Sequence, residues 1–397
     1  MKTIIGFTGD VAFSEYTKNI CDRPEKIDKR IYDFFESNDF NVINFESPIT
    51  MSEITEKDAL AHKSNPTALQ FVKKHIKNPI LSLANNHMMD FGKKGLLDSL
   101  EYTEKENLKT IGAGRNENEA TDYVILGDDV KVGILAFQYK DYFIATENAL
   151  GTAHEKHKKL IKKQIKKLKE KVDYVVLVYH GGDEFLNTPM PYTRKKIKKF
   201  LTYGADIIVA HHPHTVQGYE KIKNKTIFYS LGNFIFDTDF QRAQSGTDEG
   251  ILLKIEFSKD NYSFKEYPIY NNRKSNTIEL VTKNDNFRDI KKVYRKLWKK
   301  EANRLEQIKA NKKELRNYRN KFSINNLHIE KANCKNFVTF DQLIKDNYFD
   351  GVNEKPIFKT TNIFQRKFRR IKKKIKRVSL KKYLTIKYEK IFKYRWK

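Results

Sequence analysis

The chain has 397 residues, of which 77 are Lys or Arg and 50 are Asp or Glu, so its formal net charge is +27. A hydrophobic content of 39% with 13% aromatics is enough for a sizeable core, which excludes wholesale disorder. No apolar run reaches the roughly 18 residues of a membrane-spanning helix, and the N-terminus has no signal-peptide core. Two cysteines, Cys21 and Cys334, exclude a disulfide framework and a cysteine-based metal site. We therefore expect a cytoplasmic protein of two or three units.

Up to about residue 270, short apolar runs alternate with segments of helical periodicity. Alternation of this kind predicts a layered α/β fold. The predicted helices include Thr67–His75, Leu96–Glu106 and Lys159–Lys171. The predicted strands of this part are Thr3–Thr8, Val42–Phe45, Ile80–Ala84, Thr110–Ala113, Val132–Phe137, Tyr174–Tyr179 and Ile207–Ala210.

From Thr226 onward, strand-like runs follow one another without long helices, which predicts antiparallel strands added to the sheets. These runs are Ile227–Leu231, Phe234–Phe236, Ile251–Phe257 and Tyr262–Tyr267. Beyond about residue 280 the pattern changes to a charged helical stretch at 289–321 and an irregular one at 322–361. We expect a first domain at 1–275, an extension at 276–363 and a terminal helix at 364–397.

The terminal segment from Phe364 to Lys397 holds 16 Lys and Arg against one acid, so it supplies +15 of the net charge. Its apolar residues recur every three or four positions, which predicts an amphipathic helix (Phe364, Phe368, Ile371, Ile375 and Val378). Three partners fit such a helix: an anionic membrane surface, nucleic acid, or the protein itself. We favour the membrane, at its inner face. The other lysine-rich run, Lys158–Lys171, is interpreted as the solvated side of an ordinary helix.

Metal-capable side chains come directly after five predicted strands, where the crevices of open α/β sheets form. Five of the ten histidines lie at these positions. Carboxylates, amide oxygens and imidazoles without thiolates are the ligand set of borderline and hard divalent ions. The residues concerned are Asp10, Glu46, the Asn85–His87 run, His180, and the histidines of the His211–His214 run.

Six motifs, in chain order over about residues 3–270, resemble those of the capsule-synthesis CapA family, a branch of the calcineurin-like metallophosphoesterases. The most specific are the Ala84–Gly92, His211–His214 and Ser230–Phe236 stretches. The others are Thr8–Asp10, Asn44–Pro48 and His180–Glu184, and the resemblance does not cover the last 120 or so residues.

The resemblance implies a four-layer α/β/β/α fold with two divalent metal ions, Mn, Fe or Zn, at the strand ends. In this family's pattern Asp10 would bind one ion and Glu46 would bridge the pair. Asn86, His180, His212 and His214 would complete the shells, with His211 as a near neighbour.

The resemblance also implies that His87 protonates the leaving oxygen, since imidazole titrates near neutral pH. Asp90 and Glu184 are candidates to orient His87 and His180. Asn233 is expected on a tight turn near the site, and Arg115 is a candidate contact for an anionic substrate.

Two positions depart from the wider superfamily, which has His where this chain has Ala12 and Asp where it has Glu46. Family members also carry an N-terminal membrane anchor and act outside the cell, and this sequence shows neither anchor nor export signal. Their location therefore does not transfer.

We expect a metal-dependent hydrolase in capsule or envelope-polymer synthesis, acting on a phosphoester or an acidic polymer together with other capsule-synthesis proteins. The first alternative is a non-catalytic, membrane-associated assembly factor that grips an acidic polymer. The second is a nuclease of the same superfamily. It is disfavoured because the basic residues lie far in sequence from the metal motifs, so nucleic acid is an unlikely partner.

Overall fold

The computed structural model describes residues 2–55, 61–140 and 143–281. The chain divides into two units, residues 1–309 and 310–397, and every described residue belongs to the first. The helix expected at 289–321, the irregular stretch at 322–361 and the basic helix at 364–397 lie outside the described residues.

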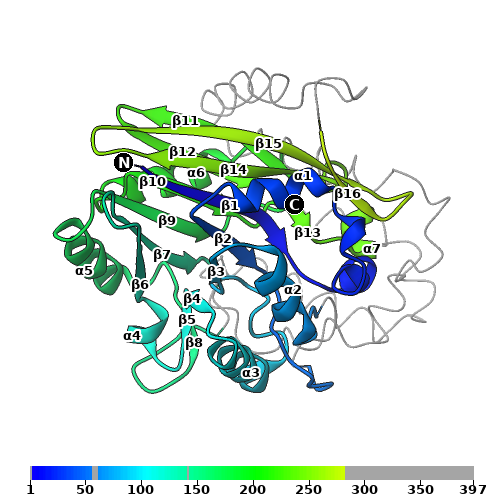
Figure 1. The fold of residues 1–397 in the computed structure, drawn as a ribbon. Coiled ribbons are helices and arrows are strands. Elements are labelled where there is room, and N and C mark those ends of the chain that lie inside the picture. The colour runs from blue at the N-terminus through cyan, green and yellow to red at the C-terminus, as the bar shows by residue number, and fades with distance from the viewer. Residues whose placement is uncertain (1, 56–60, 141–142, 282–397) are drawn as a thin grey trace, which may run out of the picture. The chain divides into compact units, whose positions relative to one another are not determined.

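Two sheets form the centre of the described unit (Figure 1). Sheet 1 has eight strands in the order β16-β15-β14-β1-β2-β3-β4, with β13 also paired to β1. Its strands are β1 (Thr3–Val11), β2 (Phe40–Phe45), β3 (Pro79–Ser82), β4 (Lys109–Ile111), β13 (Asn233–Ile235), β14 (Glu249–Phe257), β15 (Tyr262–Asn272) and β16 (Thr277–Leu280).

Sheet 2 has six strands in the order β11-β12-β10-β9-β7-β6. Its strands are β6 (Tyr123–Leu126), β7 (Val132–Gln138), β9 (Tyr174–His180), β10 (Ile207–His211), β11 (Val216–Ile222) and β12 (Lys225–Leu231). A small third sheet pairs β5 (Ala113–Gly114) with β8 (Gly151–Thr152). Sheet 2 thus comes from one continuous stretch, whereas sheet 1 is built from segments before and after it.

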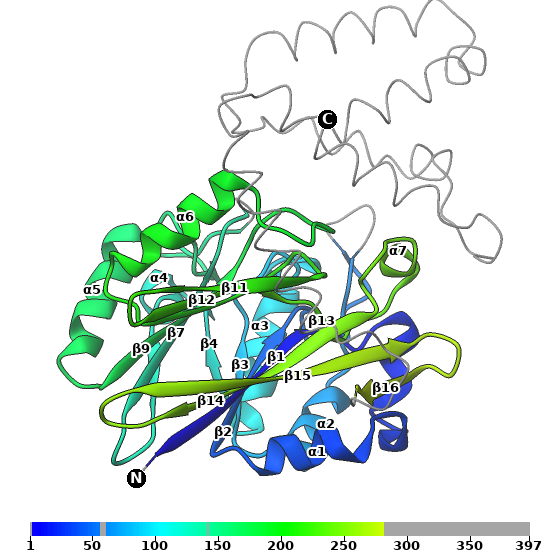
Figure 2. The ribbon, with the colours of Figure 1, turned by 90° about the horizontal axis from the view of Figure 1, so that it is seen from above.

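Helices cover the outer faces of both sheets. Residues of α1 (Lys29–Glu36), α2 (Thr67–His75) and α3 (Gly92–Lys105) share one apolar cluster with strands of sheet 1. Residues of α5 (Lys158–Lys169) and α6 (Pro191–Leu201) share another with sheet 2. Figure 2 shows α5 and α6 on one side of the sheets, with α1 and α2 on the opposite side. Short helices α4 (Glu117–Ala120), α7 (Asp239–Arg242), η1 (Glu15–Ile20) and η2 (Pro24–Lys26) complete the described elements.

A third apolar cluster joins the two sheets to each other. It contains Phe7 and Val42 of sheet 1 together with Ile134, Val176 and Val209 of sheet 2, all buried. Three clusters between four layers make an α/β/β/α sandwich, which confirms the expected fold class.

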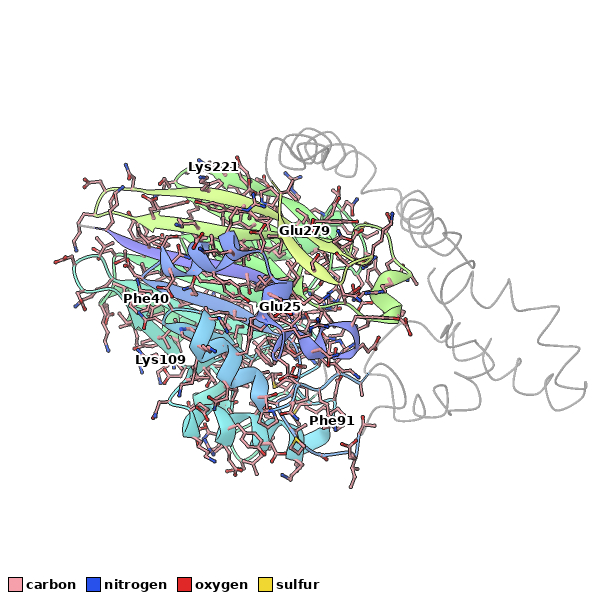
Figure 3. All side chains as sticks on the ribbon, turned by 45° about the vertical axis from the view of Figure 1, so that its right-hand side comes forward. Glu25, Phe40, Phe91, Lys109, Lys221 and Glu279 are labelled. Carbon is pink, nitrogen blue, oxygen red and sulfur yellow. The ribbon has the colours of Figure 1, made fainter. Side chains whose placement is uncertain are left out.

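Strand direction decides where the site forms. Within sheet 1, β1, β2, β3 and β4 run parallel, and within sheet 2 so do β7, β9, β10 and β12. In Figure 3, Phe40 and Lys109, which begin β2 and β4, lie on one side, while Phe91, beyond the end of β3, lies on the other. The carboxyl ends of these strands therefore share one edge. We call it the metal edge.

The predicted strands and the three predicted helices are all found, with ends shifted by a few residues. Missed elements include α1, α6, β6, β11 and β16. Strand β16 pairs with β15, so sheet 1 continues past residue 275, where the first domain was expected to end. Within the described residues, no helix is long and apolar enough to cross a membrane.

Candidate metal centre

Asp10 lies within β1, opposite Asn44 of β2, and is fully buried. Its Oδ1 accepts a hydrogen bond of 2.8 Å from Asn44 Nδ2 and lies 3.2 Å from His211 Nδ1. Its Oδ2 lies 3.1 Å from His214 Nδ1. One carboxylate oxygen is therefore held by the protein, and the other points toward the remaining candidate ligands.

Glu46 follows the last residue of β2 and is also fully buried. Its Oε1 lies 3.2 Å from His180 Nε2 and 3.7 Å from His214 Nε2. The Glu46 carboxylate therefore stands between histidines that come from two different places in sheet 2.

The imidazoles come from the ends of two adjacent strands. His180 ends β9 and His211 ends β10, and the two residues are paired in register. His212 and His214 follow with φ of +96° and +55°, a region that side chains other than glycine seldom adopt. Strained backbone of this kind occurs at functional positions, where packing holds it in place. Here it brings both rings into the cluster on either side of Pro213.

The ligand atoms form two groups that share Glu46. One group is Glu46, His180 and His212, the other is Asp10, Glu46 and His214, and within each group the atoms lie within 4.8 Å of one another. Asn86 Oδ1 lies 2.8 Å from His180 Nε2, so the amide oxygen faces the first group. The structure thus brings these six candidate residues together in one place.

The chemistry of these groups fits divalent cations. Three buried carboxylate oxygens, Asp10 Oδ2 and both oxygens of Glu46, have no hydrogen-bond partner among the described residues. Burying unpaired carboxylate oxygens is costly unless a cation or donor compensates them. Oxygen and imidazole ligands without thiolate suit Mn, Fe or Zn.

Burial and neighbouring side chains shift the pKa values of the two carboxylates in opposite directions. Burial favours protonated Asp10, but the close approach of the His211 and His214 imidazoles outweighs it and holds the pKa of Asp10 well below its usual value. Burial raises the pKa of Glu46 well above its usual value, and repulsion from Asp10 raises it further. A divalent cation beside these carboxylates would remove that repulsion and favour ionised Glu46.

His87 lies at the same edge and is oriented by Asp90. His87 Nδ1 is 2.7 Å from Asp90 Oδ2, and that oxygen also accepts a 2.9 Å hydrogen bond from the backbone N–H of His62. The rings of His62 and His87 lie 4.6 Å apart between centroids. The structure thus places Asp90 against His87, as expected, and adds His62, which is not among the residues that the sequence analysis singles out.

The expected role of Glu184 needs correction. Its Oε1 lies 3.4 Å from His212 Nε2, whereas His180 Nδ1 lies 3.3 Å from Asn44 Nδ2. The Tyr139 hydroxyl lies 2.9 Å from the same His212 Nε2. Tyr139 was missed by sequence reasoning, although it directly follows strand β7 on the metal edge.

Two further candidates differ in part from what was expected. Asn233 lies near the site, with its Oδ1 3.0 Å from His214 Nδ1, but it begins β13 rather than standing on a turn. Arg115 forms a two-point ion pair with Glu104 at the surface. Within the described residues, none of its hydrogen bonds or ion pairs reaches the cluster, so the structure does not support Arg115 as a substrate contact.

Two glycines let β13 approach β1 at Asp10. A Cβ at Gly9 would lie 2.3 Å from the carbonyl oxygen of Gly232, so only glycine fits there. Gly232 itself has a φ of +69°, and a Cβ on it would lie 2.5 Å from the backbone oxygen of Glu249. This close approach places Asn233 opposite Asp10.

Comparisons with known proteins match this chain to a family. A family model described as "Bacterial capsule synthesis protein PGA_cap" matches residues 4–238. The chain is 29% identical over 332 residues to the capsule biosynthesis protein CapA of Bacillus anthracis, which covers 79% of each chain. It is 31% identical over 261 residues to the PGA biosynthesis protein CapA of Bacillus subtilis, covering 64% of this chain and 67% of that protein.

Solved structures are more distant. A phosphatase from Mycoplasma pneumoniae matches with a TM-score of 0.44 and 12% identity, covering 68% of this chain and 94% of its own. A 5'-nucleotidase from Candida albicans matches with a TM-score of 0.39 and 12% identity, covering 77% and 58%. Likeness at this level carries no inference about activity.

Proposed function

The chain belongs to the bacterial capsule synthesis family PGA_cap, and from that membership we propose that it is a metal-dependent, phosphoesterase-type hydrolase acting in capsule or envelope-polymer synthesis. The observation that supports the hydrolase is the pair of ligand groups that share Glu46, with three buried carboxylate oxygens turned toward them. Such a set is suited to two divalent ions held close together.

In this proposal Asp10, Glu46 and His214 would hold one ion, and Glu46, Asn86, His180 and His212 would hold the other. When bound, two such ions supply Lewis acidity toward a phosphoryl oxygen and lower the pKa of a bound water. The chain's own contribution is to fix the ligands: Asn44 and His211 hold Asp10, and Tyr139 and Glu184 hold His212.

His87 is proposed to protonate the leaving oxygen. Its Nδ1 lies 2.7 Å from Asp90 Oδ2, which fixes the orientation of the imidazole at the metal edge. The second hydrogen bond that Asp90 receives, from the backbone of His62, keeps the carboxylate in place. An imidazole positioned in this way contributes about 10²–10⁴-fold to the rate.

The test uses the purified full chain with Mn²⁺ and a generic aryl phosphate. We expect hydrolysis by the wild type, and activity near background for Asp10→Ala and His87→Ala. Asp10→Ala should also lose bound metal, whereas His87→Ala should keep it, which separates the ligand from the proton donor. Equal activity in all three proteins would contradict the proposal.

A non-catalytic role is the second candidate, and one observation favours it. Ala12 is fully buried where the wider superfamily has a histidine, so the ion at Asp10 and His214 has fewer protein ligands. The protein would then bind an acidic polymer and act with other capsule-synthesis proteins. Metal analysis separates the two candidates: two ions per chain favour the hydrolase, and one ion without turnover favours the binder.

Membrane contact through residues 364–397 belongs to the same proposal. Their basic residues would each contribute about 1 kcal/mol at an anionic surface. Co-sedimentation with anionic liposomes, with and without these residues, tests it. Unchanged binding after truncation would remove the membrane from the proposal.

A further inference from the structure

The two helices that cover sheet 2 carry only one sign of charge. Helices α5 and α6 contain twelve Lys and Arg and no Asp or Glu. Nine of these lysines are exposed, and Lys169 is the one of them that forms an ion pair, with Asp206. The other eight are Lys158, Lys159, Lys162, Lys163, Lys166 and Lys167 of α5, and Lys195 and Lys199 of α6. We call these eight residues the lysine face.

Acids do not neutralise this face. Within the part of the chain that the structure describes, none of the eight ammonium groups forms an ion pair, whereas Lys169, Lys196 and Lys198 on the same helices do. Of the three helices on sheet 1, α1 and α3 mix both signs, and α2 carries only two lysines. A layer left with unpaired charge of one sign attracts polyanions.

The six residues that α5 contributes to the lysine face repeat every four residues in two rows, Lys158-Lys162-Lys166 and Lys159-Lys163-Lys167. Residues four apart lie on the same side of a helix, about 6 Å apart along its axis. The first row faces α6, because Lys162 Nζ lies 4.7 Å from the ring centre of Tyr203, just beyond α6. Regular spacing of this kind matches a polymer with repeated charges.

Both helices begin at the metal edge. Helix α5 leads into β9, which ends at His180, and α6 leads into β10, which ends at His211. A crossover helix runs antiparallel to the strand that follows it, so each helix starts where its strand ends. Basic residues continue from there: Lys140 and Lys196 lie 5.5 and 5.9 Å from the ring centre of Tyr139, whose hydroxyl contacts His212.

The residue types select among polyanions. Phosphate and nucleic-acid sites favour the two-point contacts of Arg, and the one Arg on these helices, Arg194, is paired with Glu220. Base stacking and membrane insertion need several exposed aromatic or apolar side chains, and these helices expose one, Tyr192. Compact ammonium groups without such side chains suit carboxylates.

We propose that the lysine face binds a linear polycarboxylate, which lies along α5 and α6 and reaches the metal edge at their N-termini. Helix α5 is about 18 Å long, which an extended chain spans with about five units. Binding at this face needs no metal, so it stands apart from the proposed hydrolysis.

Lysine acetylation followed by mass spectrometry tests the location on the full chain, with poly-L-glutamate as the probe and EDTA present. We expect polymer to reduce acetylation of Lys158, Lys162 and Lys166 several-fold. Lys29, Lys74 and Lys93, which are exposed on the sheet 1 side, should be unaffected. Equal protection of both sets, or protection of residues 364–397 alone, would overturn the proposal.

A matched pair of variants tests the affinity. The triple variant Lys158→Gln, Lys162→Gln, Lys166→Gln should bind labelled poly-L-glutamate about tenfold more weakly, while Lys29→Gln, Lys74→Gln, Lys93→Gln should bind like the wild type. Both variants lose three positive charges and keep the basic segment 364–397, so a difference between them reports the location of binding. Equal affinities would contradict the proposal. So would protection of the lysine face by phosphatidylglycerol vesicles, or by an oligonucleotide of equal charge, at lower concentrations than the polymer requires.

Discussion

The two sheets contribute different chemistry to the metal edge. Sheet 1 and its loops supply oxygen ligands, from Asp10, Glu46 and Asn86, and sheet 2 supplies the imidazoles of His180, His212 and His214. Neither sheet holds a complete group, because each group combines at least one residue from each. Cations bound there would join the sheets at the edge beyond their shared apolar cluster. The comparison therefore predicts that the site and the packing of the sheets depend on each other.

The largest effect is expected from Glu46, the residue that both groups share. Glu46→Gln should remove both ions and reduce hydrolysis to background, because the amide offers one neutral oxygen in place of a bridging carboxylate. The fold should persist, since the change removes a carboxyl group that Asp10 repels. Metal content and activity measure the result. The matched control is Glu249→Gln, at the same edge but outside both ligand groups. Retention of both ions by Glu46→Gln would show that the two ion sites do not depend on a shared carboxylate.

Metal addition should stabilise the described unit. At a metal concentration 100 times its Kd, one ion adds about 2.7 kcal/mol to the free energy of unfolding. For a unit of this size that corresponds to a rise in Tm of about 5–10 °C. Thermal unfolding with EDTA and with Mn²⁺ measures it, and Glu46→Gln should show no rise. A metal-bound wild type that melts at the EDTA temperature would show that the sheets do not depend on the site.

A smaller effect, limited to the ion in the group that contains His212, is expected from a change at Tyr139. Tyr139→Phe removes the hydroxyl that contacts His212 and should weaken binding of the ion in that group about 10–100-fold, leaving the other ion in place. Stepwise metal titration by calorimetry separates the two ions. Tyr229→Phe is the matched control, because its hydroxyl bonds Glu220 on the outer side of sheet 2. If the binding of both ions were weakened equally, Tyr139 would support the whole metal edge rather than the one ligand His212.

The smallest effect concerns a carboxylate of sheet 1 that is not a candidate ligand. Burial raises the pKa of Glu249 to about 7, and repulsion from Asp248 adds to the shift. Because the folded state holds this proton more tightly than the unfolded state, stability falls as pH rises from about 4.5 to 7 and then levels off. Glu249→Gln should reduce this pH-dependent fall in the free energy of unfolding by about 2 kcal/mol. Urea unfolding at pH 5 and pH 8 measures it, and an unchanged pH dependence would contradict the prediction.

The candidate ligand residues could be selected because strand ends are visible in the sequence. Asp10, Glu46, His180 and the His211–His214 run each come at or just past an apolar run, and parallel strands bring such positions together. What the sequence did not contain was the direction of each side chain. Glu184 is near His180 in sequence but contacts His212, and Arg115 turns to Glu104.

The roles of two supporting residues, Asn44 and Tyr139, depend on strand pairing, which the sequence does not show. Asn44 lies inside a strand and matters only because the register of β1 and β2 places it opposite Asp10. Tyr139 needs the pairing of β7 with β9, in which Gln138 stands opposite His180. Helix α6 was not among the predicted helices, although Ile197, Phe200 and Leu201 form its buried side.

The discontinuity of sheet 1 has a consequence for synthesis on the ribosome. Strand β1 finds β2 early, but its antiparallel neighbour β14 begins only at Glu249, after all of sheet 2 has been made. At 5–20 residues per second, the interval between β2 and β14 is about 10–40 s. During that time the open edge of β1 is available to other chains. The nascent chain is therefore most exposed to aggregation while its own second sheet is being translated.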